Sequence, residues 1–258
     1  MLKNLLYRFY ERQLLNDVRR RPIPRHVGLI QDGNRRYARE AGLSEPSEGY
    51  LLASVKTEEV LTWCAALGIP VVTLWWLSTE NLTREPDEVT AILRVIEKKM
   101  VEWIQGGLVQ QLRIRVRPIG KLELLPASTL HILQAIHSTT QRHDRMLVNV
   151  GVGYGGRQEI IDAVRSYLQE CFMQQHSAEE IIRKLSPQAL DKFLYTSDCP
   201  DPDLIIRTSG EVRLSGFMLW QSAYSEFYFC DAYWPAFRKI DFLRAIRSYQ
   251  RRERRFGQ

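Results

Sequence analysis

The stretch HVGLIQDGNRRYARE, from His26 to Glu40, decides the fold class of this chain of 258 residues. Its first five residues are mostly apolar and predict a short strand buried in the core. The chain then breaks at the tripeptide DGN, and residues 34–41 have the pattern of a helix. A strand that runs directly into a helix presents free backbone N–H groups and the positive end of the helix dipole at the strand's end.

The rest of the chain repeats this order of strand and helix. Further strands are predicted in residues 69–78, 112–120, 147–156, 202–210 and 225–237, and helices in residues 50–67, 85–105 and 124–139 and from Arg157 onward. This alternation indicates an α/β fold with a mostly parallel central sheet surrounded by helices. Because no linker, repeat or low-complexity segment interrupts it, we expect one domain. The loops that leave the carboxyl ends of the strands are then the expected site.

The formal net charge of +6 favours anionic partners such as phosphate-bearing substrates, acidic lipid or nucleic acid. Signatures of nucleic-acid-binding motifs are absent, so only charge supports such binding and we expect none. The cysteines Cys64, Cys171, Cys199 and Cys230 form no C-x-x-C pair and suit no zinc site. With no secretory signal or membrane-spanning stretch visible, we expect a cytoplasmic protein with free thiols.

Residues 1–22 form a predicted N-terminal amphipathic helix. Its leucines and Phe9 recur at helical spacing, and basic residues stand between them. Such a helix could lie on a membrane surface as a peripheral contact. The alternative that we favour is that it packs on its own domain or covers the mouth of an apolar cavity.

The segment DGNRR combines the parts of a phosphate site. Backbone N–H groups at a helix start bind phosphate, and Arg35 and Arg36 can add charge-assisted hydrogen bonds. Asp32 beside a phosphate would repel it unless Mg²⁺ bridges the two. We therefore interpret Asp32, Gly33, Asn34 and the two arginines as a magnesium–diphosphate site. The alternative is that Asp32 caps the helix and the arginines lie on the surface.

Two other strand-end loops carry candidate groups. The loop RTSGEVRLS, from Arg207 to Ser215, places two arginines and hydroxyl donors around a glycine and could bind a second diphosphate; otherwise it is a basic loop. The loop LSTENLTR, residues 77–84, offers orienting or proton-shuttling groups if it lines a cleft; otherwise it is a polar loop with a helix cap. Other chemistries fit poorly, because the chain lacks a P-loop and a G-x-S-x-G motif, and GVGYGG lacks the dinucleotide-binding spacing.

These segments together resemble one family. In order and spacing, HVGLIQDGNRRYA, LSTENLTREPDEV and DPDLIIRTSGEVRLSGFMLWQSAYSEFYF resemble the signatures of the cis-prenyltransferases, the Z-isoprenyl diphosphate synthases of the undecaprenyl diphosphate synthase family. NVGVGYGGRQEIIDAV and the ending Arg255-Phe256-Gly257 are similar to two further family segments. The resemblance implies a catalytic domain in residues 23–258, with an apolar tunnel inside the expected α/β fold, working as a homodimer.

The resemblance also implies the reaction and the roles of residues. An allylic diphosphate loses its diphosphate, C4 of isopentenyl diphosphate attacks C1, and a proton leaves to give a Z double bond. Asp32 and Glu226 would be the Mg²⁺ ligands, and Asn81 with Ser78 would help to remove the proton. Arg255 and Gly257 would reach the isopentenyl site of the partner subunit. The other implied substrate-binding residues are Gly33, Asn34, Arg35, Arg36, Tyr37, Thr79, Glu80, Arg84, Arg207, Arg213, Leu214 and Ser215.

Several positions depart from the long-chain members of the family. Tyr37 replaces a tryptophan, Arg35 replaces a glycine, Glu45 or a neighbour stands where an arginine is usual, and Tyr50 takes the place of a histidine. These departures weaken the argument that this chain binds the diphosphate at those positions as the long-chain enzymes do. They suggest a different allylic substrate.

Trp76 indicates the length of the product. Long-chain enzymes have a small residue at this position, where it lines the tunnel that receives the growing chain. An indole there fills volume that several isoprene carbons would need, and close-packed protein does not yield that volume cheaply. The sequence therefore resembles the short-chain branch, which makes products of ten or fifteen carbons from dimethylallyl or geranyl diphosphate. The alternative is that Trp76 belongs to the core and the tunnel runs past it.

Other functions stay open at this point. One is an irregular synthase, of the lavandulyl type, that makes branched or cyclic prenyl diphosphates. Others are a long-chain polyprenyl diphosphate synthase and a non-catalytic partner subunit of another prenyltransferase. The intact set of Asp32, Glu226 and arginines argues against the silent subunit.

Overall fold

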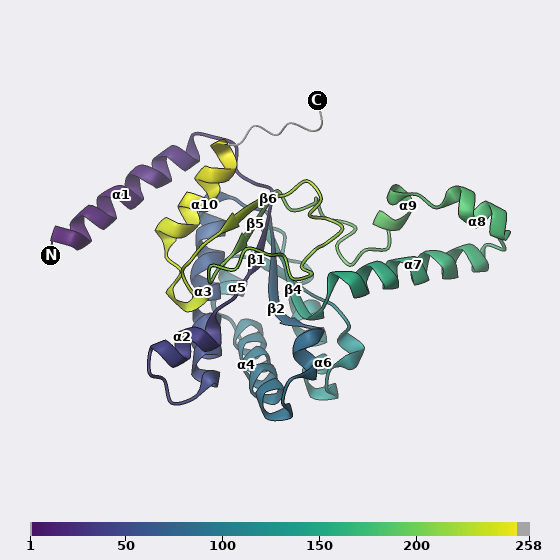
Figure 1. Cartoon of the computed structure of the whole chain (residues 1–258), viewed down its shortest axis with the longest axis horizontal. Helices are drawn as coiled ribbons and strands as arrows, with labels where there is room; N and C mark the ends of the chain where they lie inside the picture. Colours follow the sequence, from purple (N-terminus) through teal and green to yellow (C-terminus); the bar gives the residue numbers. More distant parts are fainter. Residues whose placement is uncertain (1, 252–258) are drawn as a thin grey trace.

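The computed structural model describes the backbone of residues 2–251 and, within that range, all side chains except those of residues 2–5 and 46. Figure 1 shows a central sheet with helices packed around it and an arm of helices projecting from one side. Arg255 and Gly257, for which the family resemblance implies a place in the partner's site, lie outside the described residues.

The sheet has the order β3-β4-β2-β1-β5-β6, and every neighbouring pair of strands is parallel. The mostly parallel sheet predicted from the sequence is therefore confirmed, and each predicted strand is present. The strands are β1 (His26–Ile30), β2 (Val71–Ser78), β3 (Ile114–Ile119), β4 (Met146–Tyr154), β5 (Leu204–Arg207) and β6 (Glu226–Phe229).

The predicted helices are also present, with small shifts of their ends. They are α1 (Leu2–Arg19), α2 (Asn34–Glu40), α3 (Pro46–Leu67), α4 (Pro86–Ile104), α6 (Ala127–Thr140) and α7 (Gly156–Met173). Helix α4 begins with Pro86, Asp87 and Glu88, which is favourable chemistry for a first turn. The sequence pattern did not predict α5 (Gly107–Gln111), α8 (Ala178–Lys184), α9 (Pro187–Asp191) and α10 (Lys239–Arg251).

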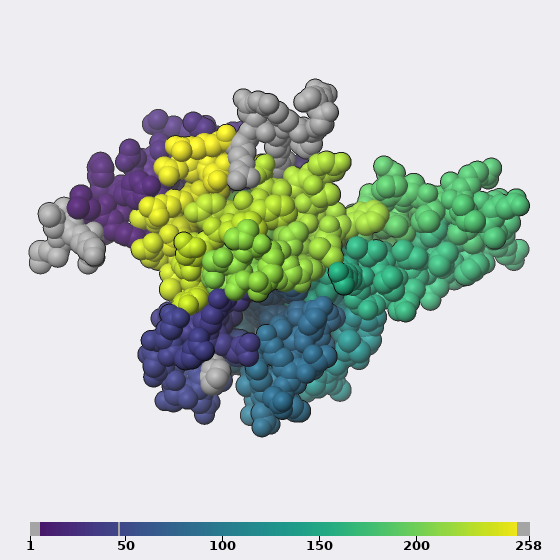
Figure 2. All heavy atoms as spheres, viewed as in Figure 1, coloured from purple at the N-terminus to yellow at the C-terminus, as the bar shows by residue number. Residues whose placement is uncertain are grey.

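The two faces of the sheet are covered differently. The main core, on one face, takes its apolar side chains from α1, α3, α4, α6 and α10. On the other face, Phe217 and Met218 from the irregular segment 208–225 pack on Ile30, Ile205 and neighbouring strand residues. A Cβ on Gly28 would lie 2.8 Å from the Phe217 ring, so the glycine lets this segment approach the sheet. The segment spreads in yellow-green across the view of Figure 2.

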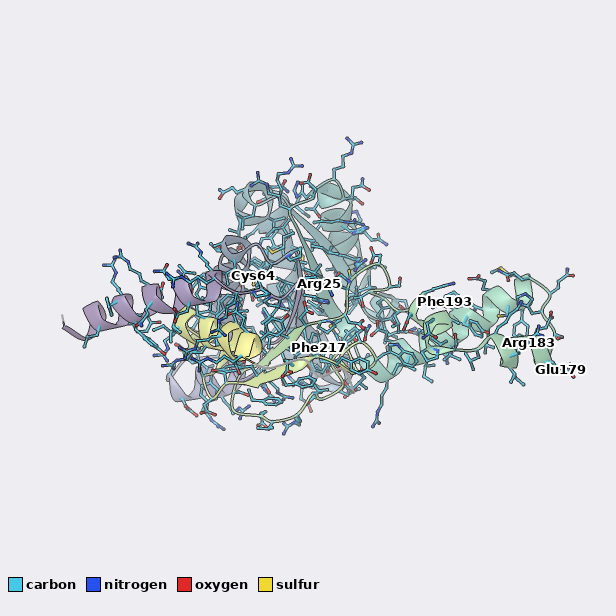
Figure 3. The ribbon with its side chains drawn as sticks, turned by 90° about the horizontal axis from the view of Figure 1, so that it is seen from above. Arg25, Cys64, Glu179, Arg183, Phe193 and Phe217 are labelled. Carbon is cyan, nitrogen blue, oxygen red and sulfur yellow. The ribbon has the colours of Figure 1, made fainter. Side chains whose placement is uncertain are left out.

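Helices α7, α8 and α9 form the arm, which has a small apolar cluster of its own. This cluster includes Tyr167, Cys171, Ile181 and Leu190. Figure 3 shows the arm reaching far from the sheet, with Glu179 and Arg183 labelled at its tip. Large apolar side chains on the arm stay exposed; they are Ile161, Phe172, Met173, Ile182 and Leu185.

Helix α1 packs on α10 at the edge of the molecule. Leu14 and Val18 are buried in the main core, and Arg244 of α10 lies over the ring of Tyr10. The expectation that this helix packs on its own domain is confirmed for its second half. Farther toward the N-terminus, Leu6 and Phe9 are 62% and 69% exposed. Among the described residues, no helix has the length and apolar character needed to cross a membrane.

His26 anchors a buried polar network at the amino-terminal edge of the sheet. Its Nδ1 lies 2.7 Å from the Pro200 carbonyl oxygen and its Nε2 lies 2.8 Å from Thr73 Oγ1, which also accepts a hydrogen bond from Asn149. Burial lowers the pKa of His26 from near 6.5 to about 4. The imidazole is therefore neutral in the folded protein at pH values where it would be protonated in the unfolded chain.

We expect this histidine to make the protein acid-sensitive. Because its pKa is lower in the folded state, the unfolded chain binds the extra proton, and the stability present above pH 6.5 is lost as the pH falls toward 4. At about 1.36 kcal/mol per pKa unit, the loss in unfolding free energy reaches about 3 kcal/mol. Urea unfolding at pH 7.5, 6 and 5 measures it. The idea fails if His26→Gln shows the same dependence on pH as the wild type.

Candidate active site

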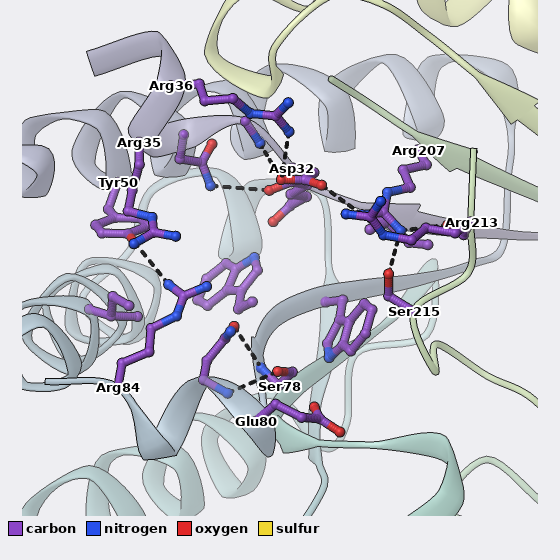
Figure 4. A pocket seen from close by; sticks show the side chains of 18 residues that line it. Asp32, Arg35, Arg36, Tyr50, Ser78, Glu80, Arg84, Arg207, Arg213 and Ser215 are labelled. Atoms are coloured by element: carbon purple, nitrogen blue, oxygen red, sulfur yellow. Dashed lines mark hydrogen bonds and ion pairs between the residues drawn. The ribbon is translucent and has the colours of Figure 1, made fainter. Parts of the chain in front are cut away.

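A cavity of about 570 Å³ opens where β1, β2 and β5 end. Figure 2 shows the surface hollowed between the blue helices α2 and α4 and the yellow-green segment above them, and Figure 4 shows the side chains inside. The lining consists of Ile30, Gln31, Asp32, Gly33, Asn34, Arg35, Arg36, Tyr50, Trp75, Trp76, Ser78, Glu80, Asn81, Arg84, Ile92, Arg207, Arg213 and Ser215. Three loops that the sequence pattern singled out therefore meet at one site.

Asp32, directly after β1, accepts hydrogen bonds from both sides of the cavity. One carboxylate oxygen is 2.7 Å from Arg207 Nη2; the other accepts the Gly33 N–H at 2.6 Å and lies 3.6 Å from Arg36 Nη2. Burial works to raise the pKa of this carboxyl, but the hydrogen bond and charge of Arg207 outweigh it and hold the pKa below its ordinary value. Asp32 is therefore ionised at neutral pH.

Gly33 forms the turn between β1 and α2. Its φ of 96° is in the left-handed region, and a Cβ there would lie 2.5 Å from the Tyr233 ring and 2.9 Å from Ser209 Cβ. Gly33 is also the N-cap residue of α2, which has no side-chain cap. The alternative in which Asp32 caps the helix is therefore wrong, and its carboxylate is directed to the cavity.

The basic residues of the cavity are held by carboxylates. Arg36 donates to Ser209 Oγ at 2.8 Å and to Glu211 at 3.2 Å, and its guanidinium lies over the Tyr233 ring. Glu211 also pairs with Arg213. These contacts join the loop after β1 to the loop after β5. An incoming anion would meet arginines that are already oriented.

A second arrangement of the same kind surrounds Glu88 on α4. Arg84 donates to Glu88 Oε1 at 2.8 Å, Arg35 lies 3.3 Å from the same oxygen, and the Tyr50 hydroxyl donates to it at 3.0 Å. Burial, and then the charge of Glu88, raises the pKa of Tyr50 to about 12, so the phenol stays protonated. Glu88 was not predicted as a site residue. Its pair with Arg84 is local, four residues apart, but only the packing of α2 and α4 on α3 brings Arg35 close to it.

Arg207, at the end of β5, is 4% exposed and organises the second loop. Its Nη1 donates to the Arg213 carbonyl oxygen and to Ser215 Oγ at 2.7 Å, and its Nη2 holds Asp32. Among the described residues its Nε has no hydrogen-bond partner. Arg213 and Ser215 are exposed to the cavity, so they are better placed than Arg207 to meet a ligand directly.

Ser78 and Asn81 form a tight turn after β2. The Asn81 N–H donates to Ser78 Oγ at 3.1 Å. The Asn81 amide is best satisfied with its oxygen toward Arg84, where it accepts hydrogen bonds of 3.2 and 2.8 Å. These two residues therefore lie in the cavity wall and connect to the arginine cluster around Glu88.

Tyr154 supports the loop that carries Arg213 and Ser215. It lies in the family segment NVGVGYGGRQEIIDAV, but the sequence indicated no role for its side chain. The fully buried hydroxyl donates to Glu159 at 2.5 Å and accepts the Met218 N–H at 3.1 Å. Ser215 and Met218 both have positive φ, 52° and 45°, a conformation that surrounding contacts must hold in place. Tyr154 at the end of β4 and Glu159 in the first turn of α7 provide such contacts.

Trp76 stands at an irregularity of the sheet. In the pairing of β2 with β4, Trp75 is opposite Gly151 and Leu77 is opposite Val152, so Trp76 is an extra residue. Trp76 packs on the main core and lies 5.5 Å from the Trp103 ring between centroids. Trp75 instead stacks on Phe217 on the other face. The indole of Trp76 therefore lies in the wall between the cavity and the main core.

The profile of one protein family, described as "Putative undecaprenyl diphosphate synthase", matches residues 30–257. This chain belongs to that family of prenyltransferases. The resemblance drawn from the sequence motifs is thereby confirmed.

Relatives and solved structures agree with this assignment. The chain is 53% identical over 257 residues to a (2Z,6E)-farnesyl diphosphate synthase of Thermobifida fusca, covering 100% of this chain and 99% of the relative. It is 50% identical over 261 residues to the enzyme of the same name in Mycolicibacterium smegmatis, covering 99% and 97%. The structure of lavandulyl diphosphate synthase from Lavandula x intermedia, in complex with dimethylallyl diphosphate, matches with a TM-score of 0.85 at 30% identity and covers 92% of this chain and 99% of that one.

Some residues assigned from the prenyltransferase motifs do not line the cavity. Tyr37, Thr79 and Leu214 are half-buried beside it and are absent from its lining. Glu226 lies at the opposite edge of the sheet, because Val27 pairs with Leu204 and Leu204 with Glu226. The five residues from Val27 to Asp32 span roughly 16 Å. The prediction that Glu226 and Asp32 hold one metal ion is therefore wrong within a single chain.

The residues of this prenyltransferase fit a metal ion that is bound together with a diphosphate. Family members generally depend on a divalent metal. Among the described residues, no cluster of three or more His, Cys, Asp or Glu could hold an ion alone. Mg²⁺ is commonly bound by one or two carboxylates, with substrate phosphates and water completing its shell. The ionised Asp32 carboxylate in the cavity would provide such a ligand.

Proposed function

We propose that this prenyltransferase is a short-chain Z-prenyl diphosphate synthase. It condenses isopentenyl diphosphate with dimethylallyl or geranyl diphosphate, releases diphosphate and forms a product of ten to fifteen carbons. The observation that carries the proposal is one cavity with basic groups on both sides of Asp32 and the Trp76 indole in its wall. The names of the two bacterial relatives, both (2Z,6E)-farnesyl diphosphate synthases, support it.

The arrangement of residues suits transfer of a prenyl group between two diphosphates. Asn34, Arg35, Arg36 and Arg84 would bind the allylic diphosphate, and Arg213 with Ser215 would bind isopentenyl diphosphate. The C–O bond at C1 of the allylic substrate breaks and its electron pair leaves with the diphosphate. A C–C bond forms from C4 of isopentenyl diphosphate, which then loses a proton. Oriented arginines stabilise the charge that develops on the leaving group.

Mg²⁺ is the cofactor that we propose, with Asp32 as its protein ligand. When bound, it would neutralise charge on the departing diphosphate. Arg207 keeps the Asp32 carboxylate ionised and in place. Ser78 and Asn81 are the candidates to help the proton leave, because both lie in the cavity wall.

The proposed enzyme is a homodimer in the cytoplasm. Its proposed contact with a membrane surface is peripheral and is made through α1. The exposed apolar side chains of the arm, such as Ile182 and Phe172, offer a surface that a second copy could cover. On α1, exposed Leu6 and Phe9 stand beside exposed Arg8 and Arg12, which suits an anionic lipid surface.

A product assay tests the function. The purified full chain is incubated with Mg²⁺, isopentenyl diphosphate and, separately, dimethylallyl, geranyl and farnesyl diphosphate, and the dephosphorylated alcohols are sized. We expect alcohols of ten or fifteen carbons with a new Z double bond. Products near fifty carbons would overturn the short-chain proposal while keeping the family.

One second candidate is favoured by a specific observation, the likeness to lavandulyl diphosphate synthase. An irregular synthase would couple two dimethylallyl units without isopentenyl diphosphate. Incubation with dimethylallyl diphosphate alone, followed by NMR of the product, separates the two functions. A branched or cyclic skeleton would favour the irregular synthase.

A further inference from the structure

A second, smaller cavity adjoins the active site between α3 and α4. Its volume is about 50 Å³. Six residues line both cavities: Gln31, Asn34, Tyr50, Trp75, Trp76 and Ile92. A cavity of about 150 Å³ holds one benzene molecule, so this space admits only a couple of carbon atoms. It continues the main cavity past Trp76 toward the inner face of α4.

One residue on the inner face of α4 breaks the apolar character of that face. Ile92, Ile96, Lys99 and Trp103 follow one another at helical spacing and are 5%, 4%, 6% and 1% exposed. Three of them are the apolar residues that a core-facing stripe requires. Lys99 is the exception, and it lines the smaller cavity.

The ammonium group of Lys99 is held by two carboxylates. Its Nζ lies 3.1 Å from Glu58 Oε1, on α3, and 2.6 Å from Glu102 Oε2. The same Glu58 oxygen accepts a hydrogen bond of 2.8 Å from the indole N–H of Trp103, whose ring packs on Trp76. Trp76, Trp103 and the ion pair therefore form one continuous wall between α3 and α4.

We propose that Lys99, paired with Glu58 and Glu102, is a second stop for the growing prenyl chain behind Trp76. It is then a specificity-determining residue for product length, and this role rests on the proposed function. A buried ammonium group costs free energy unless it is paired, and replacing such a pair by apolar residues is often stabilising, so stability alone gives no reason for a lysine here.

The physical basis of the stop is the absence of apolar surroundings. A prenyl chain gains free energy by moving from water to an apolar wall. Against an ammonium–carboxylate pair it gains little, and it removes water from Glu58, whose side chain is 32% exposed. A chain that passes the position of Trp76 would therefore still halt at Lys99.

The test compares the product lengths of four full-length proteins supplied with Mg²⁺, geranyl diphosphate and excess isopentenyl diphosphate. They are the wild type, Trp76→Ala, Trp76→Ala with Lys99→Met, and Trp76→Ala with Lys99→Arg. Methionine keeps the length of the side chain and removes its charge, whereas arginine keeps the charge. If the methionine variant is poorly folded, Glu58→Gln is added, because an amide oxygen can still accept the Trp103 N–H.

We expect the double variant with methionine to make products at least one isoprene unit longer than Trp76→Ala alone. The double variant with arginine should keep the product length of Trp76→Ala. Equal product lengths for Trp76→Ala and for Trp76→Ala with Lys99→Met would overturn the role of Lys99. Products of Trp76→Ala that are already as long as those of long-chain enzymes would also overturn it. The length of the wild-type product tests the proposed function independently of Lys99. A failure of the proposed function is therefore distinguished from a failure of this inference.

Discussion

Replacement of Asp32 by alanine is expected to lower kcat/KM by at least about 1,000-fold, which corresponds to roughly 4 kcal/mol of transition-state stabilisation. The substitution removes the proposed metal ligand and the anchor of Arg207, which connects the two sides of the cavity. Release of diphosphate under steady-state conditions measures the loss. Asp32→Asn should be similarly inactive, although its amide oxygen can still accept the Gly33 N–H.

The metal role has its own readout. Calorimetric titration of wild-type protein with the allylic diphosphate should show tighter binding when Mg²⁺ is present, and Asp32→Asn should lose that difference. Glu85→Gln is the matched control, because Glu85 is exposed, makes no side-chain cap and does not line the cavity. As a surface substitution it should leave turnover within about twofold of the wild type. Asp32→Ala with near-normal turnover and an intact oligomer would contradict the assignment.

Replacement of Trp76 by alanine is expected to lengthen the products by one or two isoprene units. Since benzene fills a cavity of about 150 Å³, the nine ring atoms of the indole occupy roughly 200 Å³, which is room for five to ten chain carbons. Loss of the ring contact with Trp103 also costs stability, up to about 3–5 kcal/mol for a fully buried tryptophan and less for this half-buried one. Chromatography of the dephosphorylated products gives their lengths.

Two further variants keep this test clear. Trp76→Leu leaves a smaller cavity and should fold where the alanine variant does not, with a smaller increase in length. Trp63→Leu is the matched control, because the half-buried Trp63 ring packs on Phe237 and Phe242 and lines neither cavity. It should leave product length unchanged even if the rate falls. Unchanged product length in an active Trp76→Ala protein would refute the steric role of the indole.

The sequence by itself determined the order of strands and helices and the residues at the strand ends. Apolar runs and helical spacing are local patterns, so they predicted each strand of the sheet and most of the longer helices. The motifs around Asp32, Ser78 and Arg207 lie at the carboxyl ends of parallel strands, and that shared edge explains why the three loops meet in one cavity. The sequence likewise assigned Trp76 to the end of the site that receives the growing prenyl chain.

Only the tertiary structure decided which groups face one another across the cavity. Glu88 pairs with Arg84 locally, four residues apart, but it reaches Arg35 only through the packing of α2 and α4 on α3. Lys99 likewise reaches Glu58 through the packing of α3 on α4. The strand register separates Glu226 from Asp32. Helices α8 and α9 of the arm, and α10, were not predicted. The physical reason is that side-chain periodicity records which way a residue points, whereas register, helix packing and bulges set its distant neighbours.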